Sequence, residues 1–366
     1  MNQLNKLFFV PSFYLFCFFN AGLLLYFLRL LPYPNPESLT IIIFFTVSIV
    51  SLASMTVSMI VLSRYKISSI FPTTTIAKQE ISTKDWLFLF LITFLGFFGL
   101  FGYLNNMLVE FGGLGEFLIV VAISSADIRA FNATYDFSIF TQLTYFSFLA
   151  FGYIIYLINF KKLSAVQKTF LIFICLLIFL LNLLYIDRTR PVWILWIGIF
   201  LIFIRFIPKI SFTTLVRRIF YVGIFFLSIF VLIGLWIGKI EQGRVTDSGL
   251  PSAIESPYSY FTGGYSYFNQ LVVEDNQITN QPMQRFFYPV LKLTAAFGLS
   301  EQPPSQINEH KYVGVDTNIG TFLEPFFQDG GFLFCILGIL IHTFFFDALC
   351  IFCLSRGNFL SIFFAS

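Results

Sequence analysis

Long apolar runs constrain this chain more than any other feature of its sequence. Several of them approach or exceed the roughly 20 residues that an α-helix needs to cross a hydrocarbon core of about 30 Å. Charged residues, Pro or Gly separate the runs, which cover residues 8–31, 39–62, 86–104, 138–160, 168–186, 192–207, 218–238 and 331–354. A soluble protein of this size cannot bury that much apolar surface. The sequence therefore predicts an all-α, polytopic integral membrane protein with about eight transmembrane helices, forming a single membrane domain over residues 1–366.

Composition narrows the class further. Charged residues make up only 11% of the chain, against about 25% in ordinary soluble domains. The net charge is +3, but the cations lie at the ends of the predicted helices, so no nucleic-acid partner is indicated. All five cysteines lie in apolar runs. This placement indicates helix packing and not a disulfide framework.

A ninth apolar stretch, residues 113–123, is too short to span a membrane. Gly112, Gly113 and Gly115 mark its start, and Asp127 and Arg129 follow it. We interpret it as a re-entrant or interfacial helix on the outer side. The alternative is a short true span, which would reverse the orientation of every later helix in the membrane.

Charge asymmetry decides the predicted orientation. With the N-terminus inside, the short loops and helix ends of the other face hold only Arg29, Arg129, Arg188 and Arg190. The inner face then receives Lys6, Arg64, Lys66, Lys78, Lys84, Lys161, Lys162, Lys168, Arg205, Lys209, Arg217, Arg218 and Arg356. The positive-inside rule predicts such an excess on the cytoplasmic side. The N-terminus is therefore predicted to be cytoplasmic.

The long stretch of residues 239–330, between the seventh and eighth predicted helices, is polar and falls on the outer face. It is a periplasmic loop if the cell has two membranes. It carries ten carboxylates against five cations. Apolar anchors at 286–291 and 321–327 argue against disorder. We expect short helices that lie on the membrane face.

Outward arginines are the first candidates for chemistry. Arg188 and Arg190 are two guanidiniums within three residues, a pattern suited to binding an anion beside lipid headgroups. The simpler reading is an ion pair with Asp187 and interfacial snorkelling. Three further outward arginines are candidates for the same site: Arg129, Arg244 and Arg285.

The aromatic segment 258–269 is the second candidate. Tyr258, Tyr260 and Tyr265 supply rings and hydroxyls suited to stacking on sugars, and Gly264 permits a tight turn or a close backbone approach. An interfacial aromatic belt is the alternative. In the same loop, His310 is a candidate general base or phosphate ligand, or an exposed histidine without a role.

Two further observations bound the chemistry. Asp347 lies inside the last predicted helix, where a carboxylate needs a partner, and we predict an interhelical structural role. The sequence has no glycine-rich phosphate loop, HExxH, G-x-S-x-G or paired metal-ligand motif. We therefore expect neither a metal nor a cofactor.

Three parts of the chain resemble the bacterial O-antigen polymerases. They are the outer turn that contains Arg188, the segment 258–269, and the run with Asn318, Phe322, Pro325, Asp329, Gly330 and Gly331. The resemblance implies an enzyme of the inner membrane that joins undecaprenyl-diphosphate-linked oligosaccharide repeat units into O-antigen or a related surface polysaccharide, as in lipopolysaccharide biosynthesis. Members commonly have ten or more spans, against the eight predicted here.

The resemblance also implies roles. Arg188 and Arg190 would stabilise the leaving diphosphate with help from Arg244 or Arg285. The aromatic segment, with Asn318, would shape the sugar site, and His310, Glu324 or Asp329 would orient the attacking hydroxyl. The partners would be lipid-linked oligosaccharides, membrane lipid and a chain-length regulator. Alternatives are a ligase that transfers the finished glycan to lipid A core, a lipid-linked oligosaccharide flippase or other transporter, and a non-catalytic scaffold.

Overall fold

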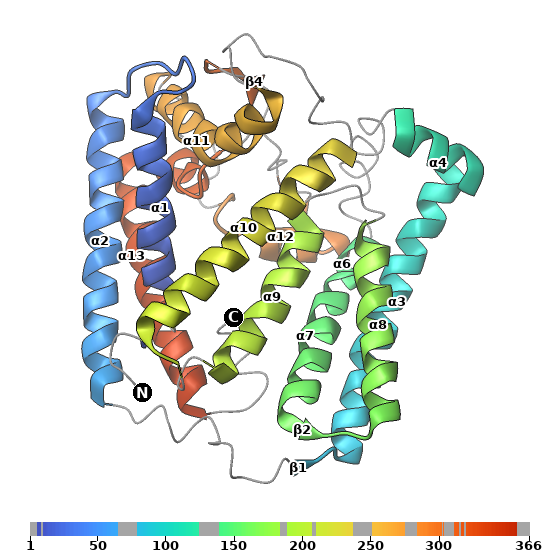
Figure 1. The fold of residues 1–366 in the computed structure, drawn as a ribbon. Coiled ribbons are helices and arrows are strands. Elements are labelled where there is room, and N and C mark those ends of the chain that lie inside the picture. The colour runs from blue at the N-terminus through green and yellow to red at the C-terminus, as the bar shows by residue number, and fades with distance from the viewer. Residues whose placement is uncertain are drawn as a thin grey trace. The chain divides into compact units, whose positions relative to one another are not determined.

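The protein is an all-α, multi-pass membrane protein (Figure 1). The computed structural model describes residues 6–8, 10–64, 79–123, 139–183, 189–206, 210–236, 251–274, 284–301, 303, 311–314, 316–317 and 320–356. The chain divides into two compact units. One comprises residues 66–239 and both chain ends, and the other comprises residues 6–65 and 240–351. The single membrane domain stays a prediction.

The eight predicted helices all appear as helices. Within the described ranges, seven spans are long and apolar enough to cross a membrane: α1 (Pro11–Leu28), α2 (Ser38–Arg64), α3 (Thr83–Glu110), α6 with α7 (Ile139–Leu143 and Tyr145–Phe160), α8 (Ala165–Leu183), α10 (Phe212–Trp236) and α13 (Glu324–Arg356). The remaining predicted helix, 192–207, is α9 (Thr189–Phe206).

In the unit of residues 66–239, glycines let helices pack closely. A Cβ atom on Gly96 would lie 2.7 Å from the backbone nitrogen of Ser147, and one on Gly99 would lie 2.6 Å from that of Thr144. Small residues at such positions are typical of helix contacts in membranes. Around this contact, α3, α7, α8 and α9 bury an apolar core that includes Leu89, Ile92, Ile154, Leu157, Leu171, Ile178 and Ile194.

The short helix predicted at 113–123 is present as α4 (Leu114–Ile123). Gly112 and Gly113 connect it to α3, and both have positive φ, at 77° and 114°. Glycine adopts this region without steric cost, so the chain turns sharply there. Its depth in the membrane stays a prediction.

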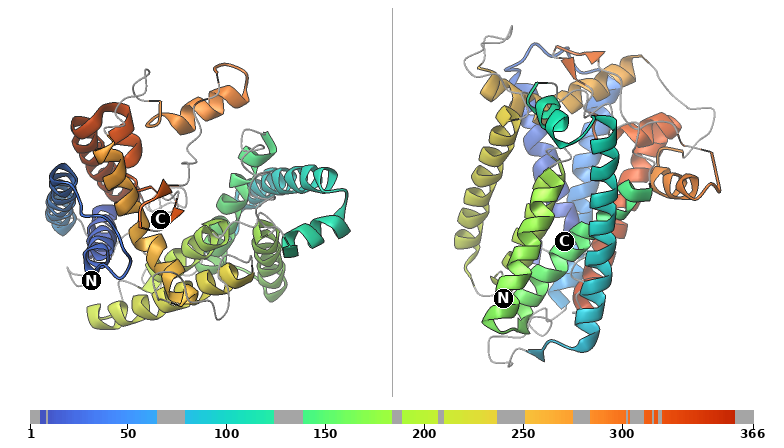
Figure 2. Two further views of the ribbon diagram at one scale, coloured as in Figure 1. Left: turned by 90° about the horizontal axis from the view of Figure 1, so that it is seen from above. Right: turned by 90° about the vertical axis from the view of Figure 1, so that its right-hand side faces the viewer.

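In the unit of residues 6–65 and 240–351, α1, α2 and α13 run alongside one another, and α11 (Ser252–Val273) lies across the ends of α1 and α2 (Figures 1 and 2). Buried aromatic residues fill the core between them, including Phe19, Tyr26, Phe44, Tyr265, Phe268 and Phe327. This unit also contains α12 (Tyr288–Ala296) and the antiparallel pair β3 (Lys311–Tyr312) and β4 (Asp316–Thr317).

The last helix begins earlier than the predicted residue 331. Its first turns, from Glu324, belong to the polar stretch, and a break at Gly330 and Gly331 separates them from the membrane-spanning part. Gly331 has φ 64° and ψ −151°, a conformation that strongly favours glycine. This conformation explains why residue 331 is a glycine.

Candidate functional site

Two tyrosines of the aromatic segment fasten α11 to α1. The Tyr258 hydroxyl donates a hydrogen bond to the Leu25 carbonyl and accepts one from the Leu30 N–H, at 3.2 Å. The Tyr265 hydroxyl donates to the Phe19 carbonyl at 2.7 Å. Both rings are buried in the aromatic core. The structure thus places these predicted sugar-stacking rings inside the unit, and their part in substrate binding stays a prediction.

The connection between α1 and α2 is held by the same face of α11. The Tyr33 hydroxyl lies 2.7 Å from the Thr262 hydroxyl. The Asn269 side chain accepts from the Glu37 N–H at 2.7 Å and donates to the Asn35 carbonyl at 3.1 Å. Burial raises the pKa of Tyr33 above its ordinary value. The polar stretch is therefore anchored to the membrane helices by buried hydrogen bonds.

Gly264 makes the close backbone approach that its sequence context predicted. A Cβ atom there would lie 3.1 Å from the carbonyl oxygen of Gly320. The alternative, a tight turn, is absent, because residues 252–273 form one helix. Tyr260 lies on the more exposed side of α11, with 37% of its surface exposed.

A buried carboxylate marks the break in α13. Asp329 is 1% exposed and accepts hydrogen bonds from the backbone N–H groups of Arg285, at 3.2 Å, and Phe286, at 2.7 Å. The Phe286 ring lies 5.6 Å from that of Phe326 on the preceding turn. Asp329 thus fixes the segment that leads into α12 against the start of the last membrane helix.

Further charged side chains lie in these two segments. Glu324, in the first turn of α13, and Lys292, in α12, are both buried, and Arg285 is half-buried. The Lys292 ammonium lies 5.7 Å from the centre of the Tyr288 ring. We call these charged residues of the two segments, Arg285, Lys292, Glu324 and Asp329, the α12–α13 polar site; within it the Arg285 backbone N–H contacts the Asp329 carboxylate. Buried charges are costly and concentrate at functional positions.

Arg190 occupies a separate environment in the unit of residues 66–239. Its guanidinium donates to the Thr144 hydroxyl at 2.8 Å and lies over the rings of Tyr145 and Phe148, at 5.3 and 5.9 Å. A planar cation over aromatic rings is suited to binding an anion. Nearby, Asn182 donates to the Ser147 hydroxyl at 3.2 Å.

Several predicted site residues lie outside the described ranges, so the structure gives no position for them: Arg129, Arg188, Arg244, His310 and Asn318. The proposed pair of Arg188 with Asp187 is among these. Within the described part of the chain, no three His, Cys, Asp or Glu side chains are grouped so that they could hold a metal ion.

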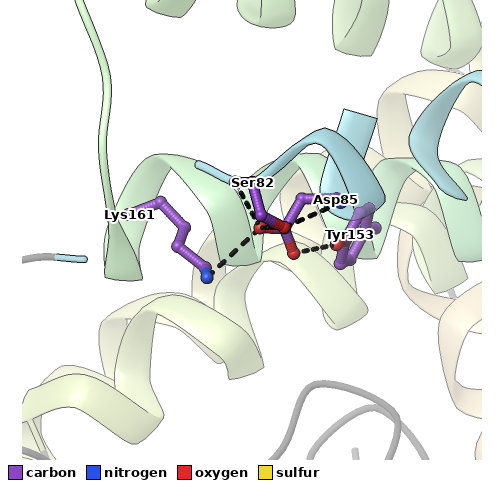
Figure 3. Close-up of polar contacts among 4 residues, drawn as sticks. All are labelled: Ser82, Asp85, Tyr153 and Lys161. Atoms are coloured by element: carbon purple, nitrogen blue, oxygen red, sulfur yellow. Dashed lines mark hydrogen bonds and ion pairs between the residues drawn. The ribbon is translucent and has the colours of Figure 1, made fainter. Parts of the chain in front are cut away.

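Sequence reasoning missed a polar network around Asp85 (Figure 3). Asp85 and Ser82 form a capping box at the start of α3. The Tyr153 hydroxyl donates to Asp85 at 2.8 Å, and the Lys161 ammonium lies 3.3 Å from its carboxylate. The spacing of Ser82 and Asp85 was a readable signal. The partners Tyr153, on α7, and Lys161, directly after α7, come from tertiary packing, which the sequence alone does not specify.

The structure confirms the interhelical role predicted for Asp347. This buried carboxylate accepts hydrogen bonds from the Ser12 N–H and from three serine hydroxyls on α1 and α2: Ser12, Ser54 and Ser58. It lies near the end of α13 that is far from the α12–α13 polar site, because it follows Gly331 by 16 residues of helix. It therefore belongs to the framework of the unit.

No known protein family, curated protein or solved structure matches this chain. The resemblance to O-antigen polymerases therefore stays a prediction that depends on the motifs quoted above.

Proposed function

We propose that this protein is a membrane glycosyltransferase that joins undecaprenyl-diphosphate-linked oligosaccharide repeat units into O-antigen or a related surface polysaccharide. The α12–α13 polar site is the observation that carries the proposal. It comprises two buried carboxylates, one buried ammonium and one half-buried guanidinium, from the segment around α12 and the first turns of α13. An enzyme that acts on a sugar attached to a membrane-bound diphosphate needs both kinds of group there.

In the proposed reaction, the carboxylate and the cations have different roles. A hydroxyl of the acceptor sugar attacks the anomeric carbon of the donor, the glycosidic bond forms, and the bond to undecaprenyl diphosphate breaks. Glu324 takes the proton of the attacking hydroxyl as the general base. The cations Arg285 and Lys292 stabilise the negative charge that gathers on the leaving diphosphate.

Asp329 acts as a positioning residue in this scheme. Its carboxylate holds the backbone of Arg285 and Phe286, so it sets where the Arg285 side chain begins. Arg190 is a second anion-binding group, supported by its aromatic neighbours and its donor geometry. Placement in an inner membrane with a cytoplasmic N-terminus, and cooperation with a chain-length regulator, belong to the same proposal.

The test is a surface-glycan gel of a deletion strain complemented with variants at equal protein level. Deletion should leave core with a single repeat unit, and wild type should restore the ladder. Glu324→Gln removes one charge at nearly constant shape and should reduce polymer by about 100-fold or more, the usual contribution of a general base. Glu301→Gln is the matched control, because Glu301 is an exposed carboxylate of the same polar stretch.

Two outcomes would contradict the proposed reaction, and a third would contradict only the role of Glu324. An unchanged ladder in the deletion strain excludes a polymerase. Loss of all glycan from the core indicates the ligase reaction instead. A full ladder with Glu324→Gln keeps the reaction but removes Glu324 from its assigned role.

A further inference from the structure

The segment around α12 exposes its apolar side chains and buries its lysine. Four apolar side chains recur at helical spacing on one face, and all of them are exposed: Phe286, Val290, Leu293 and Phe297. Val290 is 57% exposed and Phe297 is 63% exposed, whereas Lys292, in the middle of the helix, is only 8% exposed. A surface helix in water shows the opposite pattern, with its lysine outside and its apolar stripe against the core.

The apolar face extends beyond the helix at both ends. Phe287, before α12, and Leu299, after it, are also exposed. Together with the four stripe residues they form the α12 apolar face. Among the described residues 284–299, the only charged side chains are Arg285 and Lys292, and neither is exposed. The most exposed side chains of this segment are therefore uncharged.

The conformation of α12 is well defined. Pro289 stands at its start and Gly298 follows its end, with φ 70°. Gly298 and Leu299 donate backbone hydrogen bonds to the carbonyls of Ala295 and Thr294, both at 2.9 Å, which closes the helix. Proline at the start and glycine after the end are the usual helix boundaries. Val290 and Leu293, the middle of the apolar stripe, thus belong to a helix with defined ends.

The position of α12 next to α13 bears on what covers the α12 apolar face. Figure 2 shows α12 (orange) beside the first turns of α13 and running across its direction. After the break, α13 continues with exposed Leu333, Leu337 and Ile341, and it is long and apolar enough to cross a membrane. The α12 apolar face therefore belongs to a segment that lies next to a candidate membrane span.

We propose that α12 is embedded in one leaflet of the bilayer, with the α12 apolar face in contact with lipid acyl chains. A helix that lies in the membrane plane buries its apolar side in the hydrocarbon and keeps its polar groups away from it. In this arrangement Lys292 is on the protein side of the helix. The inference does not depend on the proposed enzymatic activity.

Photo-crosslinking in lipid nanodiscs tests the contact directly. Phe297 is replaced with p-benzoylphenylalanine in the full-length protein, and in a second variant Phe287 is replaced, so that a folding defect at one position does not decide the result. The benzophenone carbonyl, when irradiated, inserts into a nearby C–H bond. We expect a protein species heavier by one phospholipid, measured by intact mass.

Tyr312 is the matched control, because it is an aromatic residue of the same unit, in β3, and is 77% exposed. The lipid adduct at Phe297 and Phe287 should exceed that at Tyr312 several-fold. Equal yields at all three positions, or no lipid adduct at Phe297 and Phe287, would overturn the proposal. Crosslinks to a second protein chain would also overturn it and would assign the face to a protein partner.

Discussion

At the scale of single residues, Asp347 shows how this protein accommodates a carboxylate inside a membrane-spanning helix. One oxygen accepts from the Ser12 N–H at 2.9 Å, and the other accepts from three serine hydroxyls at 2.6 to 2.8 Å. Ser12 stands in the first turn of α1, whose own N-cap residue, Val10, provides no side-chain acceptor. Asp347 therefore caps α1 from a distant part of the chain.

Replacing Asp347 with Ala should destabilise the protein strongly. The variant leaves a backbone N–H and three hydroxyls buried without their acceptor, at a cost of about 3 kcal/mol. Unfolding in a graded detergent titration, followed by tryptophan fluorescence, measures the change. Thr46→Ala is the control, since the Thr46 hydroxyl bonds only within its own helix, to the Ile42 carbonyl. Equal stability of the two variants would show that Asp347 is not the cap.

The sequence predicted part of this arrangement. A carboxylate within an apolar run indicated an interhelical partner, because an unpaired charge in a membrane is costly. It did not indicate which residues would meet it. Serines are frequent in α2, and only the packing of the folded helices distinguishes Ser54 and Ser58 from the others.

At the scale of helices, the close packing of α3 against α6 and α7 depends on glycines, which have no side chain. Gly96 and Gly99 face the backbone of Ser147 and Thr144, where α6 gives way to α7. Because lipid is as apolar as the helices, burial of apolar surface does not drive this contact, and close van der Waals packing must do so.

A methyl group at Gly99 should therefore separate the helices. We expect Gly99→Ala to destabilise the protein by about 1–3 kcal/mol, the usual cost of overpacking. Thermal unfolding of the purified protein in detergent measures the effect as a lower midpoint. Gly223→Ala is the control, because Gly223 also lies in an apolar helix, α10, but has no atom within 4 Å of a built Cβ. Gly223→Ala should leave the midpoint unchanged or raise it slightly.

Apolar runs predicted the bounds of the membrane helices, whereas the short helices expected in the polar stretch had no predicted bounds. The span predicted at 39–62 is α2 (Ser38–Arg64), since hydropathy reports its length directly. By contrast, the glycines and tyrosines at 258–269 suggested a turn or a binding surface. They form the middle of a 22-residue helix, because the tyrosines find buried acceptors on α1. Such tertiary contacts override the local signal.

At the scale of the whole molecule, the asymmetry of basic residues predicts how the chain crosses the membrane. The clusters around Lys161 and Arg217 fall on the same predicted side as the N-terminus, and residues 239–330 fall on the opposite side. Helix positions alone do not fix this orientation, since reversing every helix leaves the fold the same. The distribution of Lys and Arg carries the information.

Cysteine labelling of intact cells tests the orientation. Tyr312→Cys, in the polar stretch, should react with a membrane-impermeant maleimide added outside, because this position is exposed. Lys162→Cys, which is also exposed, should react only after the membrane is permeabilised. The native cysteines all lie in apolar runs, so wild type gives the background.

The reverse pattern would invert the topology and place the α12–α13 polar site on the cytoplasmic side, where finished repeat units on the outer face are out of reach. Orientation therefore decides whether the proposed polymerase reaction is possible at this site.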